Sequence, residues 1–172
     1  DDIARIRRVQ ALYPDSKIRL DANGGFEAPE AIDLINQLKS LGINIEYFEQ
    51  PVASIAEMAE LKLQVNRLGI KIAADESVRK VSDPLAVAQA NAADILILKA
   101  APLGGIVRAL EIAAEAELPV VVSSALDSSV GLSMGAYLAA AIPNLDFDCG
   151  LATSALLAGD VTREPLRAEN GF

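Results

Sequence analysis

The stretch Ile70-Lys71-Ile72-Ala73-Ala74-Asp75-Glu76-Ser77 is a short apolar run that ends in two carboxylates and a hydroxyl. The pattern recurs before and after it, so that a charged residue closes each of four successive apolar runs: Asp21, Glu49, Asp75 and Lys99. Neighbouring members of this series are separated by about one strand and one helix. In a parallel α/β barrel, the C-terminal ends of the strands share one face, and the active site lies there. The sequence therefore predicts that these four residues belong to one functional face.

Composition narrows the class of protein. The chain has 172 residues, of which 52% are hydrophobic and 4% aromatic, which suits one domain, or a piece of a larger one, built on buried parallel strands. The formal net charge of −9 argues against nucleic acid or an anionic membrane as a partner. The single Cys149 cannot form an internal disulfide, and no apolar run is long enough to span a bilayer. We therefore expect a cytoplasmic protein.

Apolar runs and helical patterns alternate along the chain, which is typical of a parallel sheet with right-handed crossovers. Strands are predicted at residues 17–20, 43–48, 70–74, 94–98, 120–123 and 145–149. Helices are predicted at residues 1–13, 29–41, 54–68, 82–92, 106–117 and 128–141, with a short helical turn at 154–158. Ser54 is predicted to begin a helix, and Gly42 and Gly69 are each predicted to end one.

Two α/β architectures fit this alternation. A doubly wound sheet would use six strands as they stand, whereas a (β/α)8 barrel needs eight strands and about 250 residues. The chain opens on a helix rather than on a strand, and Asn23-Gly24-Gly25 lacks the G-x-G-x-x-G spacing of a dinucleotide site. We therefore expect residues 1–172 to form one partial (β/α)8 barrel domain, covering about strands 3 to 8, with the first two strands upstream.

Asp21, Glu49 and Asp75 are predicted to hold a metal ion. Each carboxylate taken singly could be a helix cap or a solvated loop residue. Three carboxylates at adjacent strand ends repel one another, and a cation relieves that repulsion. Oxygen ligands without histidine or cysteine suit a hard ion, which favours Mg²⁺ over Zn²⁺.

Lys99 and two serines are candidates for contact with a substrate. Lys99 ends an apolar run, and close to a divalent cation its amine would act as an acid or base near neutral pH; the alternative is a loop lysine. Ser123 and Ser124 follow the next strand and could hold a substrate carboxylate, whereas Ser128 or Ser129 caps a helix. The chain contains no histidine, which excludes a Ser-His-Asp triad.

Asn23, Gln50 and Glu76 are candidates for supporting the metal ligands. Each lies one or two residues from a predicted ligand. In a strand the next residue points to the other face, so Gln50 and Glu76 are weaker candidates for ligands than their neighbours. A supporting role and a purely structural role both remain open for these three residues.

Several of these segments together resemble the muconate-lactonising subgroup of the enolase superfamily. The matching segments are Leu20-Asp21-Ala22-Asn23-Gly24-Gly25, Phe48-Glu49-Gln50-Pro51, Ala74-Asp75-Glu76-Ser77 and Leu98-Lys99 with the pair Gly104-Gly105. The resemblance implies that Asp21, Glu49 and Asp75 bind Mg²⁺, or Mn²⁺ in its place, and that the metal stabilises an enediolate formed from a small carboxylate substrate. It also implies that Lys99 is the family's lysine on the sixth strand.

The C-terminal half resembles one branch of the superfamily, the o-succinylbenzoate synthase family. The matching segments are residues 123–131, Cys149-Gly150-Leu151-Ala152-Thr153, Leu156-Leu157 and Asp160-Val161. This resemblance implies a lyase that dehydrates a cyclohexadiene carboxylate in menaquinone biosynthesis. In that family Lys99 would stabilise the enediolate, while a lysine on the second strand moves the protons.

The chain departs from the family pattern in one respect. The second-strand K-x-K pair and the N-terminal capping domain are not in this sequence. We therefore expect residues 1–172 alone to be inactive, and to self-associate or to pair with the missing N-terminal segment. Three alternatives remain: a dipeptide epimerase, which Asp146-Phe147-Asp148 favours, a muconate cycloisomerase, and an inactive fragment that binds metal or a partner.

Overall fold

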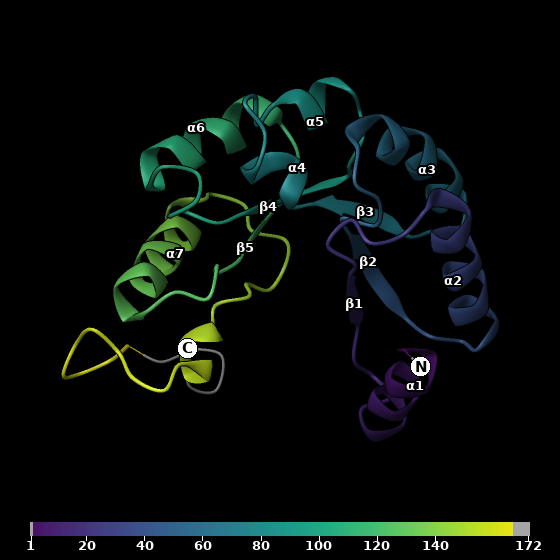
Figure 1. The fold of residues 1–172 in the computed structure, drawn as a ribbon, viewed down its shortest axis with the longest axis horizontal. Coiled ribbons are helices and arrows are strands. Elements are labelled where there is room, and N and C mark those ends of the chain that lie inside the picture. Colours follow the sequence, from purple (N-terminus) through teal and green to yellow (C-terminus); the bar gives the residue numbers. More distant parts are fainter. Residues whose placement is uncertain (1, 167–172) are drawn as a thin grey trace. The chain divides into compact units, whose positions relative to one another are not determined.

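The computed structural model describes residues 2–166, and Figure 1 labels their helices and strands. The chain divides into two compact units. Unit 1 contains residues 2–77 and 86–94, and unit 2 contains residues 78–85 and 95–166. Among the described residues, no helix has the length and apolar character needed to cross a membrane.

Unit 1 contains three parallel strands in the order β1-β2-β3, joined by helices. Its elements are α1 (Asp2–Leu12), β1 (Ile18–Asp21), α2 (Ala28–Ser40), β2 (Ile45–Glu49), α3 (Ile55–Arg67), β3 (Lys71–Ala74) and α5 (Ala86–Gln89). Asp21 pairs in register with Glu49, and Glu49 with Ala73. The strands therefore end together at their C-terminal edge.

The core of unit 1 lies where α2 and α3 pack, side by side in Figure 1. The fully buried side chains include Ile35 and Leu38 of α2, and Met58 and Leu61 of α3. With Ala31 and Val65 included, the buried residues recur every three or four positions, which gives each helix one apolar face. Phe48 in β2 contributes to the same buried set.

The predicted start of α3 at Ser54 and the predicted ends of α2 and α3 at Gly42 and Gly69 are confirmed. The Ser54 hydroxyl accepts a hydrogen bond from the Glu57 backbone N–H, 3.2 Å away, at the start of α3. Gly42 and Gly69 follow α2 and α3 with φ values of +71° and +78°. These values lie in the left-handed region that glycine adopts without steric cost, which explains why both helices end there.

Unit 2 contains two parallel strands and the helices that follow them. Its elements are β4 (Ile95–Leu98), α6 (Ile106–Ala116), β5 (Val120–Val122), α7 (Ser129–Ala141) and the 3₁₀ helix η1 (Thr153–Leu156). Every residue of β4 and β5 is buried, as expected for parallel strands covered on both faces. Leu98 and Val122 are register partners, so β4 and β5 also end together.

The predicted strand at residues 145–149 is wrong. Only one parallel bridge forms, between Ser123 and Gly150, supported by a 2.9 Å bond from the Gly150 N–H to the Val122 carbonyl. β5 is only three residues long and offers few ladder partners. Asp146 and Asp148 are also exposed, so the segment lacks the continuous apolar run of a buried strand.

The segment after β3 also differs from the prediction. A short helix, α4 (Glu76–Arg79), was not predicted, and α5 is limited to Ala86–Gln89 within the predicted helix 82–92. Asp83 accepts a 2.9 Å bond from the Leu85 N–H, which forms a turn ahead of α5. Asn91 has a left-handed φ of +50°, which prevents α5 from continuing to residue 92.

Candidate metal centre and active site

Unit 1 brings the three predicted metal ligands to one edge of its sheet. Asp21 is the last residue of β1, Glu49 is the last residue of β2, and Asp75 follows β3 directly. Asp21 and Glu49 are register partners, and Glu49 pairs with Ala73, two residues before Asp75. The backbone positions of the three carboxylates therefore lie on adjacent strands.

The three carboxylates differ in exposure. Asp21 is exposed, and its Oδ1 accepts hydrogen bonds from the backbone N–H and the side-chain amide of Asn23, at 3.0 and 2.8 Å. Glu49 is half-buried, and Asp75 is fully buried. A buried carboxylate is costly unless a hydrogen bond or a cation compensates its charge. An oxygen-only set with one buried member therefore fits a hard divalent cation.

The side chains do not form a closed ligand group in their present rotamers. Within residues 2–166, no three carboxylate, histidine or cysteine side chains lie together as a metal-binding group. The fold thus supplies the strand-end positions and the donor chemistry. Rotation of the side chains at Asp21 and Glu49, which are not fully buried, would be needed to bring the oxygens together.

Gln50 and Glu76 lie immediately after two of these carboxylates. Gln50 is fully buried, and its side-chain Oε1 accepts a hydrogen bond from the Asp75 backbone N–H, 3.2 Å away. Glu76 is half-buried and is the first residue of α4. Of the residues predicted to support the ligands, Asn23 and Gln50 therefore contact them directly.

Unit 2 places Lys99 and Ser123 directly after register-paired residues of β4 and β5. Lys99 is half-buried, and its backbone carbonyl accepts a 3.2 Å bond from the Leu103 N–H. The Ser123 N–H donates to the Leu98 carbonyl at 3.0 Å, which continues the β4–β5 ladder. Within unit 2, both residues therefore lie at the C-terminal end of the strands.

The Ser124 hydroxyl is engaged inside unit 2. Ser124 is buried, and both its backbone N–H and its hydroxyl donate to the Gly150 carbonyl, each at 3.0 Å. Its Oγ also lies 2.8 Å from Oγ1 of Thr153. Ser124 is thus hydrogen-bonded to the segment that leads into η1. Of the two residues predicted to contact a substrate, Ser123 is the more accessible.

Sequence reasoning missed the structural role of Asp160, which caps α7. Its Oδ2 accepts bonds from the backbone N–H and the hydroxyl of Ser129, at 2.9 and 2.7 Å. These hydrogen bonds from Ser129 lower the pKa of Asp160 below its usual value. Ser128 is the residue before the helix, but its side chain makes no capping bond. No local pattern could have identified a cap that lies so far along the chain.

Lys62, a buried polar residue, was also missed. Its Nζ donates to Oδ1 of Asn91 at 2.7 Å and to the Ala93 carbonyl at 2.9 Å, and pairs with Oδ1 of Asp94 at 3.3 Å. Oδ2 of Asp94 accepts a 2.8 Å bond from the Ile72 N–H. This cluster therefore lies at the N-terminal end of β3, opposite the carboxylates. Lys62 shares the helical spacing of its apolar neighbours, and that spacing could have identified it.

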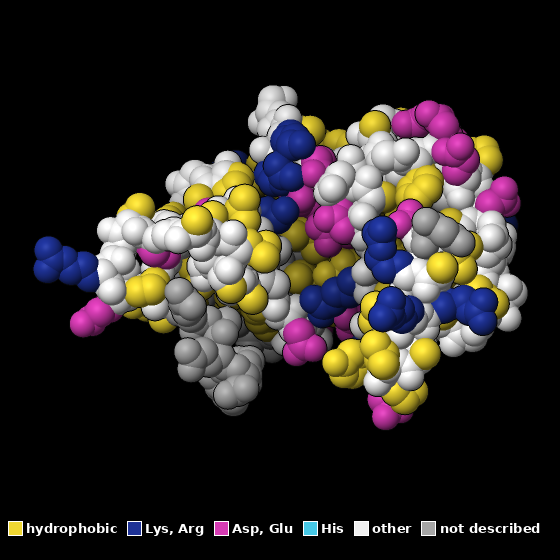
Figure 2. Space-filling view, turned by 60° about the horizontal axis from the view of Figure 1, so that its bottom comes forward, with side chains coloured by type: hydrophobic (Ala, Val, Ile, Leu, Met, Phe, Trp, Pro, Cys, Tyr) yellow, Lys and Arg dark blue, Asp and Glu magenta, His cyan; other side chains and the backbone are white. Residues whose placement is uncertain are grey.

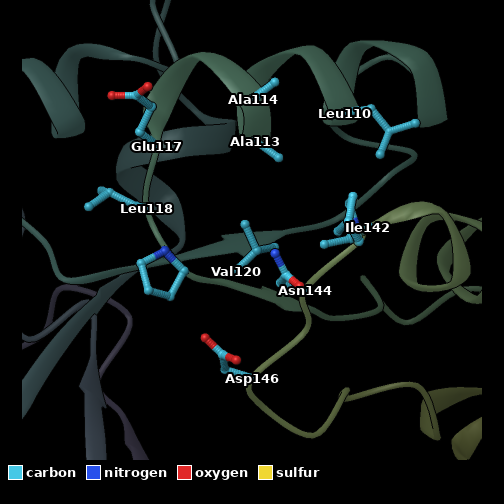
Figure 3. Close-up of a pocket in the computed structure, with 11 residues that line it drawn as sticks. Leu110, Ala113, Ala114, Glu117, Leu118, Val120, Ile142, Asn144 and Asp146 are labelled. Atoms are coloured by element: carbon cyan, nitrogen blue, oxygen red, sulfur yellow. The ribbon is translucent and has the colours of Figure 1, made fainter.

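A cavity of about 400 Å³ lies at the N-terminal end of β5 in unit 2 (Figure 3). Leu110 of α6 and Glu117, the residue directly after α6, line one part of it. Ile142 and Asp146, from the segment after α7, line another. Ser123 lies beyond the other end of β5. The cavity is thus separate, within unit 2, from the residues predicted to contact a substrate. Figure 2 shows hydrophobic, acidic and basic side chains on one face of the molecule.

Curated relatives match the chain along its whole length. This chain is 52% identical over 172 residues to the o-succinylbenzoate synthase of Mycobacterium tuberculosis, and the match covers 100% of this chain and 51% of that protein. The o-succinylbenzoate synthase of Mycobacterium leprae is 49% identical over 172 residues, covering 49% of that protein. The chain therefore spans about half the length of the curated relatives that it matches.

Solved structures agree with the predicted fold class. The L-Ala-D/L-Glu epimerase from Bacillus subtilis is similar with a TM-score of 0.82 and 30% identity, covering 93% of this chain and 45% of that one. A muconate lactonizing enzyme from Pseudomonas fluorescens is similar with a TM-score of 0.84 and 27% identity, covering 95% of this chain and 44% of that one. These matches confirm an incomplete (β/α)8 barrel.

A family model described as "Enolase C-terminal domain-like" matches residues 1–172. The match includes the strand ends that carry Asp21, Glu49 and Asp75 and the strand end that carries Lys99. The resemblance inferred from the sequence motifs is thereby confirmed. The chain belongs to the enolase C-terminal domain-like family.

Proposed function

We propose that this chain supplies the metal ligands and one lysine of an o-succinylbenzoate synthase. The reaction is a syn elimination of water, through an enediolate, from a 2-succinyl-6-hydroxy-cyclohexadiene carboxylate in menaquinone biosynthesis. The observation that carries the proposal is the placement of Asp21, Glu49 and Asp75 at one edge of unit 1. The identity of 49–52% to o-succinylbenzoate synthases over the whole chain supports this choice within the superfamily.

Enzymes of this superfamily use a divalent metal, and we propose Mg²⁺, with Mn²⁺ as a substitute. Asp21, Glu49 and Asp75 would hold it. When bound, the ion would offset the negative charge that develops on the substrate carboxylate. Asn23 would keep Asp21 oriented, and Gln50 would keep Asp75 oriented, through the hydrogen bonds already described.

Lys99 would contribute a positive charge beside the enediolate. Lys99 directly follows the fully buried strand β4 and is itself half-buried, so the strand fixes where its side chain begins. A second lysine, supplied from outside these 172 residues, would move the protons. The proposed partners are therefore a small carboxylate substrate and the remaining part of the barrel, and neither nucleic acid nor a membrane. With one cysteine and no internal disulfide, we also propose a cytoplasmic location.

The proposal is tested by turnover in a protein of the relatives' full length that carries this sequence. We expect loss of the substrate's diene absorbance with Mg²⁺, no turnover with EDTA, and recovery when Mg²⁺ is returned. Glu49→Gln should lower turnover about 100-fold or more, because a charged ligand is lost. Glu30→Gln, an exposed change in α2, is the matched control. EDTA-resistant turnover, or none from the unmodified protein, would overturn the proposal.

A dipeptide epimerase is the second candidate. Asp146-Phe147-Asp148 and the similarity to the Bacillus subtilis epimerase favour it. Asp146, however, lines the cavity at the N-terminal end of β5, away from Ser123 within unit 2. Exchange of the dipeptide Cα proton for solvent deuterium, without turnover of the cyclohexadiene substrate, would favour the epimerase.

A further inference from the structure

Gln50 joins the three segments that follow β1, β2 and β3. Its backbone carbonyl accepts a 2.7 Å bond from the Gly24 N–H, and its backbone N–H donates to the Ala73 carbonyl at 2.8 Å. These bonds connect the loop after Asp21 and the last part of β3 to the residue directly after Glu49. The main chain of Gln50 therefore touches the surroundings of all three predicted ligands.

The side chain of Gln50 adds four more hydrogen bonds. Oε1 accepts from the backbone N–H groups of Asp75 and Ser77, at 3.2 and 3.1 Å. Nε2 donates to the Val52 carbonyl at 2.9 Å and to the Ser77 hydroxyl at 2.7 Å. Oε1 of the amide thus accepts from two donors, and Nε2 donates to two acceptors, a carbonyl and a hydroxyl, so both ends of the side chain are fully hydrogen-bonded.

The burial and backbone conformation of Gln50 indicate that its surroundings hold it in one conformation. Gln50 is fully buried, and its φ of +35° lies in a region that residues other than glycine rarely adopt. Such a conformation persists where the surrounding contacts over-determine it, and strained residues cluster at functional sites. At Gly24, an added Cβ would lie 3.2 Å from the Ala53 Cα, so the loop after β1 also approaches this segment closely.

We propose that Gln50 is the positioning residue of the metal centre. It fixes the spacing between the Glu49 and Asp75 backbones before the ion binds, and so holds two like-charged ligands together that would otherwise separate. The inference rests on the proposed metal site, and it adds that the preorganisation comes mainly from one neutral buried amide. Residues that orient ligands in this way typically change metal affinity by 10- to 100-fold when they are replaced.

Mn²⁺ alone is the probe. Its affinity for a protein of the relatives' full length that carries this sequence is measured by the paramagnetic resonance of the free ion. Gln50→Met keeps the volume and removes all four side-chain hydrogen bonds. We expect Mn²⁺ affinity to fall by about 10-fold or more. The matched control is Lys62→Met, which removes a buried polar cluster of the same unit at the opposite end of β3. This control should lower the midpoint of urea unfolding but leave Mn²⁺ affinity unchanged.

The outcomes are distinguishable. Equal Mn²⁺ affinity in Gln50→Met and the unmodified protein would overturn the role of Gln50 and leave the metal site standing. An equal loss in both variants would also overturn it, since the loss would follow general stability. No Mn²⁺ binding by the unmodified protein would overturn the proposed metal site itself, and this inference with it. If Gln50→Met does not fold, Gln50→Asn, with the same amide on a shorter stem, is judged by the same criteria.

Discussion

Asn23 adopts a left-handed backbone conformation, with φ +47°, while its backbone N–H and its amide both donate to Oδ1 of Asp21. Asparagine tolerates this region better than most residues, and the Asp21 carboxylate forms the turn by accepting from the backbone N–H two residues on. One residue therefore shapes the loop after β1 and holds a predicted metal ligand. These two contributions can be separated by substitution.

Asn23→Gly and Asn23→Ala both remove the amide bond to Asp21, but only glycine adopts the positive φ without strain. We expect Asn23→Ala to lose about 1 kcal/mol more unfolding free energy than Asn23→Gly. Mn²⁺ affinity should fall by the same factor in both, because the lost amide bond is the same. Urea unfolding and Mn²⁺ titration measure the two effects. Equal stability of the variants would refute the backbone part of this account.

Lys99 is expected to act on the chemical step rather than on metal binding. In a protein of the relatives' full length, Lys99→Ala should lower turnover about 100-fold or more, because a charge near the developing enediolate is removed. Mn²⁺ affinity should change far less than turnover. Arg108→Ala, in the exposed ion pair with Glu111 on α6, is the control for loss of a positive charge. Retained turnover in Lys99→Ala would rule out a catalytic role.

At the scale of elements, α7 begins where a distant carboxylate meets it. Asp160 accepts two hydrogen bonds from Ser129, and the Ser129 hydroxyl also donates to the Leu166 carbonyl at 3.3 Å. A negative charge at a helix N-terminus is favourable because it meets unpaired backbone N–H groups and the positive end of the helix dipole. The loop carrying Ser123 and Ser124 precedes this helix, so the cap also restrains that loop.

The lowered pKa of Asp160 gives this cap a pH dependence. The folded state favours the charged carboxylate, so the stabilisation is present above the usual aspartate pKa and is lost as the pH falls through the lower folded value. We expect Asp160→Asn to have a lower urea unfolding midpoint than the unmodified protein at pH 7. The difference between the two midpoints should become smaller below about pH 4. Urea unfolding at several pH values measures this. A difference that is constant with pH would contradict the charged cap.

Elements defined by local patterns could be predicted, and those defined by distant partners could not. The Ser54 cap and the glycines after α2 and α3 follow from short-range chemistry, and they were predicted correctly. The strand at 145–149 failed because its partner, β5, is only three residues long. The positions of the three carboxylates followed from the parallel alternation. The Gln50, Lys62 and Asp160 clusters join residues more than twenty positions apart, and no spacing rule in one sequence reveals those partners. The helical spacing of Lys62 indicates only that its side chain lies on the buried face of α3.

At the scale of the whole molecule, the chain matches about half of each curated relative. In unit 1, β1 pairs with β2 on one side, and no other strand within residues 2–166 covers its second side. An uncovered strand edge presents unpaired backbone groups that bind other chains. Activity and solubility are therefore expected to require more of the barrel than residues 1–172.

We expect residues 1–172, expressed alone, to dimerise or aggregate and to show no synthase turnover. Light scattering measures the association, and the absorbance assay measures the turnover. A protein extended to the relatives' full length should be both soluble and active, because the sheet edge is then covered and the second lysine is supplied. A monodisperse, active monomer of residues 1–172 would show that the partial-barrel account is wrong.

The central claim is that Asp21, Glu49 and Asp75 together bind one divalent cation. The most direct test is anomalous diffraction from crystals of the protein grown with Mn²⁺, which locates the ion independently of any assay. We predict one strong peak within about 2.0–2.3 Å of a carboxyl oxygen from each of the three residues, close to the distances expected for Mg²⁺. A peak that contacts none or only one of them, or no peak at saturating Mn²⁺, would contradict the account.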